Sequence, residues 1–302
     1  MRALLLYLAR QEGIKNHALK LKFFHDTAMR FVAGESLDDA IRVVRQTNQQ
    51  GLSGTLDLLG ENTITPEDAD NACREVMAVT DRIRTEGVNC NISVKLTQLG
   101  LDLGSELAFQ NLMRIARHAR DAGNFVRVDM EDSRYTGVTL DIVTRAHSEL
   151  GNVGTVIQSY LHRSERDTLD LVEKGIRVRL VKGAYLEPES VAFRKKQETD
   201  ANFSKLMKIL LAGKTYNAIA THDESLISET MEFARSNGIS RDRFEFQMLY
   251  GIRRELQLKL AQEGYNVRVY IPYGKRWYPY FMRRLAERPA NVAFILRNLF
   301  RK

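Results

Sequence analysis

The chain of 302 residues contains only two cysteines, Cys73 and Cys90, and no apolar run long enough to span a membrane. Two cysteines cannot build the framework of a disulfide-stapled fold, so we expect a reducing compartment and a cytoplasmic protein. A membrane helix needs roughly 20 apolar residues. The apolar run near the N-terminus has only about seven and is followed by no small-residue cleavage site, so we interpret it as a packed helix.

Nucleotide and metal motifs are also missing. No G-x-G-x-x-G sequence follows a predicted strand, which argues against a Rossmann site. The sequence Gly-Lys-Thr at 213–215 resembles the end of a phosphate-binding loop, but that motif requires glycine where this chain has Lys208. His222 and Asp223 stand without a second pair of ligands, so we expect no metal.

The composition is that of a globular protein with a full core, with 44% apolar and 27% charged residues. The net charge of +7 is concentrated at residues 268–302, which contain nine basic residues and one acid. Such a patch suits nucleic acid, an anionic membrane surface or an anionic ligand. No zinc-finger spacing or RNA-recognition signature accompanies it, so we expect no nucleic-acid partner.

Eight short apolar runs of strand type alternate with stretches of helical period after residue 49. Their average spacing, roughly 31 residues, is that of one strand and one crossover helix. We therefore predict an α/β fold, a (β/α)8 TIM-type barrel over residues 49–302 with an N-terminal helical arm over residues 1–48. The predicted strands are 54–59, 91–96, 125–130, 155–161, 178–181, 218–220, 244–249 and 267–271. The predicted helices are 66–86, 106–122, 140–150, 166–174, 197–212, 224–237 and 255–262, several of them ended by Gly87, Gly123, Gly175, Gly238 and Gly264.

Side chains alternate along these strands in a way that indicates a polar barrel interior. An unpaired buried charge is costly, and barrel interiors are normally apolar, so many charges from different strands favour a ligand site at the C-terminal strand ends. Among them we expect Lys95 to pair with Asp129. The residues predicted to face inward are Ser93, Lys95, Arg127, Asp129, Glu131, Arg177, Arg179, Glu245, Gln247, Leu249, Arg268 and Tyr270.

The last predicted helix carries Tyr280, Arg283 and Arg284 at spacings of three and four residues, which place them on one face. Adjacent guanidinium groups repel each other unless an anion lies between them, and their planar shape suits a carboxylate. The plain alternative is a solvated basic helix face. With Lys95 opposite, we predict that this helix caps the mouth of the barrel and that the three charges hold an anionic amino or keto acid.

Several segments resemble the proline dehydrogenase family, the flavin-dependent barrel that also forms one domain of bifunctional proline utilisation proteins. The two most specific are R-L-V-K-G-A-Y at 179–185 and Y-x-x-R-R at 280–284. The others are L-G-E at 59–61, S-V-K-L at 93–96, V-D-M-E at 128–131, Q-S-Y at 158–160, A-T-H-D at 220–223, F-E-F-Q-M-L at 244–249 and Y-I-P-Y-G at 270–274. Together they cover nearly the whole chain from residue 50 onward.

The resemblance implies oxidation of L-proline to 1-pyrroline-5-carboxylate by hydride transfer from C5 to N5 of non-covalently bound FAD. The cofactor-binding residues that it implies are Gln158, Arg179, Val181, Lys182, Gly183, Ala184, Thr221 and His222. The substrate-binding residues are Lys95, Ala184, Tyr185, Leu249, Tyr270, Tyr280, Arg283 and Arg284, and the catalytic ones are Arg179, Lys95 and Asp129. Glu61 is expected to close the site by pairing with Arg283.

The resemblance also implies partners. We expect a membrane quinone as electron acceptor, with the basic C-terminal segment lying peripherally against the membrane. Since the chain ends without an aldehyde dehydrogenase or DNA-binding domain, we expect the monofunctional form and a separate pyrroline-5-carboxylate dehydrogenase downstream. The chain has Leu186 where many relatives have tryptophan and Asp223 where others have asparagine. Tyr270 favours proline over 4-hydroxyproline, because relatives that oxidise the latter tend to have a smaller residue there.

Two other classes of function stay open from the residues alone. Lys95 and Lys182 are candidate Schiff-base nucleophiles of an aldolase-like barrel. The basic C-terminal patch also fits a module that binds anionic ligands or nucleic acid without catalysis.

Overall fold

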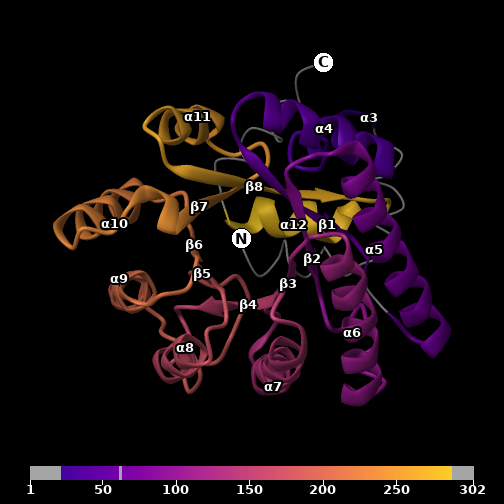
Figure 1. The fold of residues 1–302 in the computed structure, drawn as a ribbon, viewed down its shortest axis with the longest axis horizontal. Coiled ribbons are helices and arrows are strands. Elements are labelled where there is room, and N and C mark those ends of the chain that lie inside the picture. The colour runs from indigo at the N-terminus through magenta and orange to yellow at the C-terminus, as the bar shows by residue number, and fades with distance from the viewer. Residues whose placement is uncertain (1–21, 61–62, 288–302) are drawn as a thin grey trace.

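The computed structural model describes residues 22–60 and 63–287, within which eight parallel strands close into a barrel (Figure 1). Each strand pairs with the next along the chain, and β8 returns to β1, so the sheet has no open edge. The strands are β1 (Ser53–Leu58), β2 (Cys90–Val94), β3 (Val126–Val128), β4 (Val153–Gln158), β5 (Val178–Val181), β6 (Asn217–Ala220), β7 (Phe244–Leu249) and β8 (Asn266–Tyr273). The predicted (β/α)8 barrel is confirmed.

Helices between the strands form the outer layer of the barrel. Local sequence explains their limits, as in α5, where Thr65 and Asp68 form a capping box and Gly87 ends the helix with a left-handed φ of 59°. The other four glycines predicted to end helices also have positive φ. The helices are α5 (Pro66–Glu86), α6 (Ser105–Asp121), α7 (Ser133–Leu150), α8 (Ser164–Glu173), α9 (Lys196–Ala212), α10 (Glu224–Ser236) and α11 (Arg254–Gln262).

Helix α7 begins at Ser133, well before the start at residue 140 that the sequence predicted. In its first turns the buried positions are held by Tyr135, Thr136 and Thr139. Because two of these are polar, the apolar period that marks a helix is absent there, and the prediction placed the start too late.

The N-terminal helical arm was predicted over residues 1–48, and its described part is two helices, α3 (Lys22–Ala28) and α4 (Leu37–Gln49). The chain turns between them at Gly34, whose φ of 122° is unfavourable for other residues. Ile41 and Val44 of α4 are buried in the same hydrophobic cluster as barrel residues such as Leu56. The described part of the segment therefore packs on its own barrel.

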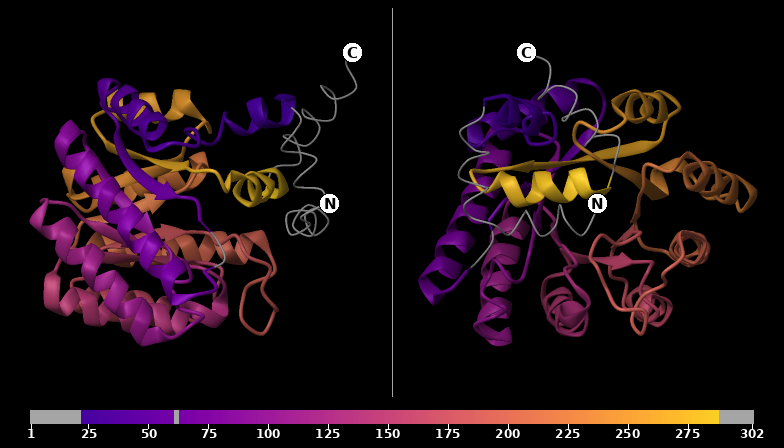
Figure 2. Two further views of the ribbon diagram at one scale, coloured as in Figure 1. Left: turned by 90° about the vertical axis from the view of Figure 1, so that its right-hand side faces the viewer. Right: turned by 180° about the vertical axis from the view of Figure 1, so that it is seen from behind.

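Helix α12 (Trp277–Glu287) lies at one end of the barrel, beside α3 (Figure 2). Its Phe281 is fully buried and meets the ring of Phe24 edge to face, with the centroids 5.3 Å apart. Trp277, also fully buried, donates from Nε1 to Oε1 of Glu35 at 2.9 Å. These contacts hold α12 in place from the side away from the barrel.

Within residues 22–60 and 63–287, no helix combines the length and the apolar character that a membrane crossing requires. Cys73 and Cys90 are both buried free thiols. Burial raises the pKa of the Cys90 thiol to about 12, so it stays protonated.

Candidate active site

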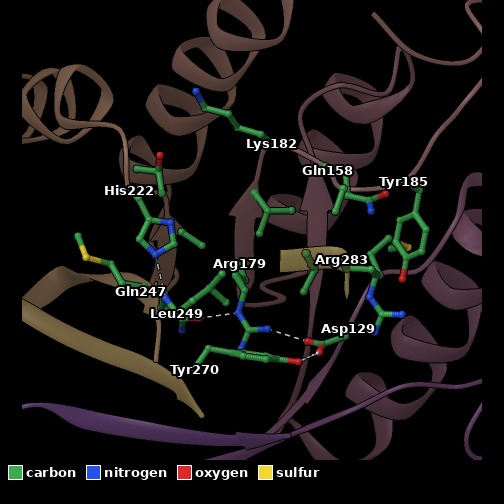
Figure 3. A pocket seen from close by; sticks show the side chains of 18 of the residues that line it. Asp129, Gln158, Arg179, Lys182, Tyr185, His222, Gln247, Leu249, Tyr270 and Arg283 are labelled. Atoms are coloured by element: carbon green, nitrogen blue, oxygen red, sulfur yellow. Dashed lines mark hydrogen bonds and ion pairs between the residues drawn. The ribbon is translucent and has the colours of Figure 1, made fainter. Parts of the chain in front are cut away.

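A cavity of about 650 Å³ lies between the C-terminal strand ends and α12 (Figure 3). Sixteen of the residues predicted for the site line it: Lys95, Asp129, Gln158, Arg179, Val181, Lys182, Gly183, Ala184, Tyr185, Thr221, His222, Leu249, Tyr270, Tyr280, Arg283 and Arg284. Glu61 lies outside the described residues, so its pairing with Arg283 stays a prediction. The structure thus brings together side chains from strands that are far apart in the sequence.

Arg179 of β5 is the centre of the buried polar network and is only 5% exposed. Its Nε donates to Oε1 of Gln247 at 2.5 Å, its Nη1 to Oδ1 of Asp129 at 2.6 Å, and its Nη2 to Oγ of Ser93 at 3.1 Å. These acceptors come from β7, the end of β3 and β2. The guanidinium group is therefore fixed in orientation from three sides of the barrel.

Asp129 joins Arg179 to Tyr270. The second carboxylate oxygen, Oδ2, accepts a hydrogen bond from the Tyr270 hydroxyl at 2.7 Å, and the Arg179 guanidinium lies 5.2 Å from the centre of the Tyr270 ring. Burial, with the negative charge of Asp129, raises the pKa of Tyr270 well above its usual value. The phenol therefore stays neutral and keeps donating to Asp129.

The predicted pairing of Lys95 with Asp129 is present, but it is the longer of two ion pairs that Lys95 makes. The Lys95 ammonium lies 2.7 Å from Oδ1 of Asp57 and 3.7 Å from Oδ2 of Asp129. Burial by itself lowers the pKa of Lys95, but the charges of Asp57 and Asp129 outweigh it and raise that pKa above its ordinary value. Lys95 is thus a fixed positive charge at the cavity wall.

Asp57 was missed because the alternation of β1 was not followed to its end. It pairs in register with Ser93 of β2, which was predicted to face inward. Neighbours in register on parallel strands share a face, so the same alternation would have placed Asp57 in the barrel. Gln247, which was predicted to face inward but was given no role, also lines the cavity. The other lining residues that the prediction of the site omitted are Met130, Val156, Lys196, Ala220, Asp223 and Met248.

Below the cavity the inward charges form structural pairs. Nε of Arg268 lies 3.0 Å from each carboxylate oxygen of Glu245, and Gln247 donates to the same carboxylate. Gln247 in turn accepts from Arg179, which links this lower pair to the cavity. Arg177 was predicted to face inward but is exposed at the start of β5, because the chain enters the barrel only at Val178.

On α12, Tyr280, Arg283 and Arg284 share the face that lines the cavity. The Arg284 guanidinium lies 5.2 Å from the centre of the Tyr280 ring. Both arginines are half-buried, which strengthens their attraction for an anion relative to a solvated surface. The predicted common face is therefore present, and it is not a fully solvated one.

A second charged cluster lies at the β5 and β6 side of the cavity. Nζ of Lys182 lies 2.5 Å from Oδ1 of Asp200 and 2.9 Å from Oδ2 of Asp223. The hydrogen bond from Lys182 lowers the pKa of Asp223, which also caps α10 by accepting from the Ser225 backbone. Asp223 is thus a fixed anion beside Lys182.

His222 is held in one tautomer. The backbone N–H of Leu249 donates to its Nε2 at 3.0 Å, so a neutral ring carries its proton on Nδ1. Arg253 donates to the backbone carbonyl of His222 at 3.1 Å. The ring is therefore fixed at the cavity wall (Figure 3).

Two features of the floor between β4 and β5 bear on a bound group. Gln158 is 3% exposed, its Nε2 donates to the Glu131 carbonyl at 3.2 Å, and among the described residues its buried Oε1 accepts no hydrogen bond. Gly183 has a φ of 116°, and a Cβ there would lie 2.2 Å from the ring of Tyr160. Oε1 of Gln158 is therefore an acceptor that lacks a donor, and the close approach of residue 183 to the Tyr160 ring is one that only glycine permits.

Comparison with known proteins gives a consistent result. Residues 40–297 match the family model described as proline dehydrogenase. The chain is 43% identical over 275 residues to proline dehydrogenase 2 of Bacillus subtilis, with 91% of each chain covered. It is 43% identical over 279 residues to proline dehydrogenase of Deinococcus radiodurans, covering 91% of this chain and 90% of the relative. Its fold is similar to the crystal structure of proline utilization A from Bdellovibrio bacteriovorus inactivated by N-propargylglycine, with a TM-score of 0.85, 28% identity and coverage of 96% of this chain and 35% of that one.

Proposed function

The chain belongs to the proline dehydrogenase family, and from that premise we propose that it oxidises L-proline to 1-pyrroline-5-carboxylate with non-covalently bound FAD. The observation that carries the proposal is that Lys95, Arg283 and Arg284 line the same cavity as the apolar and aromatic side chains of Leu249, Tyr270 and Tyr280. Lys95 approaches from the strand ends, and Arg283 and Arg284 approach from α12. Such a set fits a small substrate with one carboxylate.

The residues present fit a flavin. The buried Oε1 of Gln158 would accept from an N–H of the ring. Gly183, whose backbone passes directly against the Tyr160 ring, is part of the same cavity wall. The residues that would hold the cofactor are Gln158, Arg179, Val181, Lys182, Gly183, Ala184, Thr221 and His222. When bound, FAD supplies the hydride acceptor, N5, for the hydrogen on C5 of proline.

The chain itself positions the substrate. The Lys95 ammonium has three donors, and one of them is engaged by Asp57, which leaves the others for a carboxylate. The proposed walls around the proline ring are Ala184, Tyr185, Leu249, Tyr270 and Tyr280. Holding the ring in one orientation converts a rare encounter into a prearranged one, which is the main contribution of the protein to the rate.

Arg179 has the electrostatic role. Its three bonded acceptors keep the guanidinium group in place beside the cavity, where a fixed positive charge would stabilise negative charge that develops on a bound flavin. Asp129 fixes both Arg179 and Tyr270. The proline nitrogen must be neutral to release hydride, so we expect the free amine to be the reacting form.

The aldolase alternative fits the site poorly. A Schiff-base lysine needs a lowered pKa so that it is a free amine. Lys95 has a raised pKa, and Lys182 is paired with Asp200 and Asp223. Both lysines are paired with carboxylates that favour the ammonium form, and an ammonium group is not a nucleophile.

The spectrum of the purified protein tests the function. We expect flavin absorbance that is bleached under anaerobic conditions by L-proline. We expect much less bleaching by 4-hydroxyproline, because Tyr270 lines the cavity and relatives that oxidise 4-hydroxyproline tend to have a smaller residue there. A protein that stays colourless after FAD is added, or flavin that L-proline does not reduce, would overturn the assignment.

For reoxidation we propose a membrane quinone, reached by peripheral association of the basic C-terminal segment with anionic lipid. Its residues beyond 287 lie outside the described structure. Salt-sensitive binding to anionic vesicles would support this, and no binding at low salt would refute it. A separate pyrroline-5-carboxylate dehydrogenase would consume the product.

A further inference from the structure

The segment between β5 and α9, residues 182–195, is a long connection at the mouth of the cavity. Loops longer than about 12 residues without their own secondary structure are uncommon and are often functional. This one carries Ala184 and Tyr185 in the cavity wall. It starts from β5, yet Glu187 reaches the first residue of α7, the helix that follows β3. Since β4 lies between β3 and β5, the loop passes over the end of β4.

Glu187 makes two hydrogen bonds at the N-terminus of α7. Its Oε1 accepts from the backbone N–H of Ser133 at 2.7 Å, and its Oε2 accepts from the Ser133 hydroxyl at 2.5 Å. The N-cap residue itself, Asp132, makes no capping hydrogen bond through its side chain. A carboxylate from a distant loop therefore satisfies donors at the positive end of this helix, a favourable place for a negative charge.

Backbone contacts hold the two ends of the loop to the segment that follows β4. The Tyr160 N–H donates to the Lys182 carbonyl at 2.9 Å, and the Phe193 N–H donates to the Tyr160 carbonyl at 2.8 Å. The turn at Gly183 lies directly against the Tyr160 ring. Between these ends, Glu187 connects the middle of the loop to the opposite side of β4, two residues after Tyr185.

We propose that Glu187 is a positioning residue that, through Ser133, holds Tyr185 as a wall of the substrate cavity. The inference rests on the proposed function for the identity of the substrate. Tyr185 lies close enough to Lys95 to influence the pKa of that ammonium group, so displacement of the ring would alter the space beside the proposed carboxylate site. Release of the loop should therefore weaken binding more than it slows the chemical step, because Glu187 itself does not line the cavity.

Steady-state kinetics of the variants E187Q and S133A, with E189Q as the matched control, test this proposal. Glu189 is an exposed acid of the same loop, 3.8 Å from Arg194. For E187Q we expect the KM for L-proline to rise about tenfold with kcat within about twofold, as for the loss of a charge-assisted hydrogen bond. S133A, which keeps the backbone donor, should show a smaller rise, and E189Q should match the wild type. A KM for E187Q equal to that of E189Q, or a fall in kcat as large as the rise in KM, would overturn the role.

Amide hydrogen exchange of the full chain supplies a readout that needs no substrate. Faster exchange over residues 184–188 in E187Q than in E189Q supports the contact with α7, and equal exchange overturns it. Should the wild type fail to oxidise L-proline, the proposed function fails, while the exchange experiment still decides whether Glu187 holds the loop.

Discussion

The ammonium group of Lys95 lies 2.7 Å from a carboxylate oxygen of Asp57, a residue of the first strand that is 0% exposed. This pair fixes one of the three cations proposed to hold the substrate carboxylate, the other two being Arg283 and Arg284. A buried ion is stable only with a well-placed partner, so the first strand is part of the site even though the family resemblance was based on other residues.

Replacing Asp57 tests how much this ion pair contributes to the stability of the fold. We expect D57N to lower the free energy of unfolding by about 3 kcal/mol, because it leaves the buried Lys95 charge with a neutral neighbour. The control D38N removes an acid that is 75% exposed in its contact with Arg82, and it should change stability by less than about 1 kcal/mol. Urea unfolding measures both. Equal stabilities for the two variants would contradict the proposed importance of the buried pair.

Arg179 should not tolerate lysine. A lysine keeps the charge but cannot donate in three fixed directions to Gln247, Asp129 and Ser93. For R179K we expect kcat/KM for L-proline to fall about 100-fold, the usual cost of losing one preorganised electrostatic donor. R177K, at the exposed start of the same strand, is the control and should stay near the wild type. Proline titrations under matched flavin loading give the comparison.

The arginine pair of α12 should act mainly on binding. We expect R283M and R284M each to raise the KM for L-proline roughly 10- to 100-fold, as for the loss of a charged hydrogen bond to the carboxylate. K275M, at an exposed position just before the helix, is the control. Initial rates over a wide range of proline concentration separate KM from kcat. An unchanged KM in both arginine variants would contradict the proposed role of this helix face in binding the carboxylate.

The stability that the charged Lys95 contributes should be lost at alkaline pH. Its pKa in the folded protein lies above its value of about 10.4 in an unfolded chain, so the charged pair contributes its full stability below about pH 10 and loses it only as the pH rises through the folded value. We expect the melting temperature of the wild type to fall more steeply above pH 10 than that of K95M. The variant controls for the buried tyrosines, which titrate in both proteins. Parallel pH profiles would contradict the assignment.

The periodicity of apolar residues was enough to predict the barrel from the sequence. Strands such as β5 and β7 and the helix α5 have the bounds that the sequence predicted, because a two-residue alternation and a 3.6-residue period are written locally. The same alternation turned Lys95, Asp129 and Arg179 inward. Where the apolar period is interrupted by polar residues, as in the threonine-containing start of α7, the predicted helix started too far along the chain.

Only the tertiary structure decided which charged groups meet. Lys95 and Asp57 are 38 residues apart, Arg179 and Gln247 are 68 apart, and Ser133 and Glu187 are 54 apart. Whether two such groups bond depends on strand register and on the path of a loop to within an ångström, and composition and period do not contain that information. The sequence by itself therefore determined the barrel and the kinds of side chain inside it. Closure of the sheet and the path of the loop after β5 selected the partners, since hydrogen bonds weaken steeply with distance and angle.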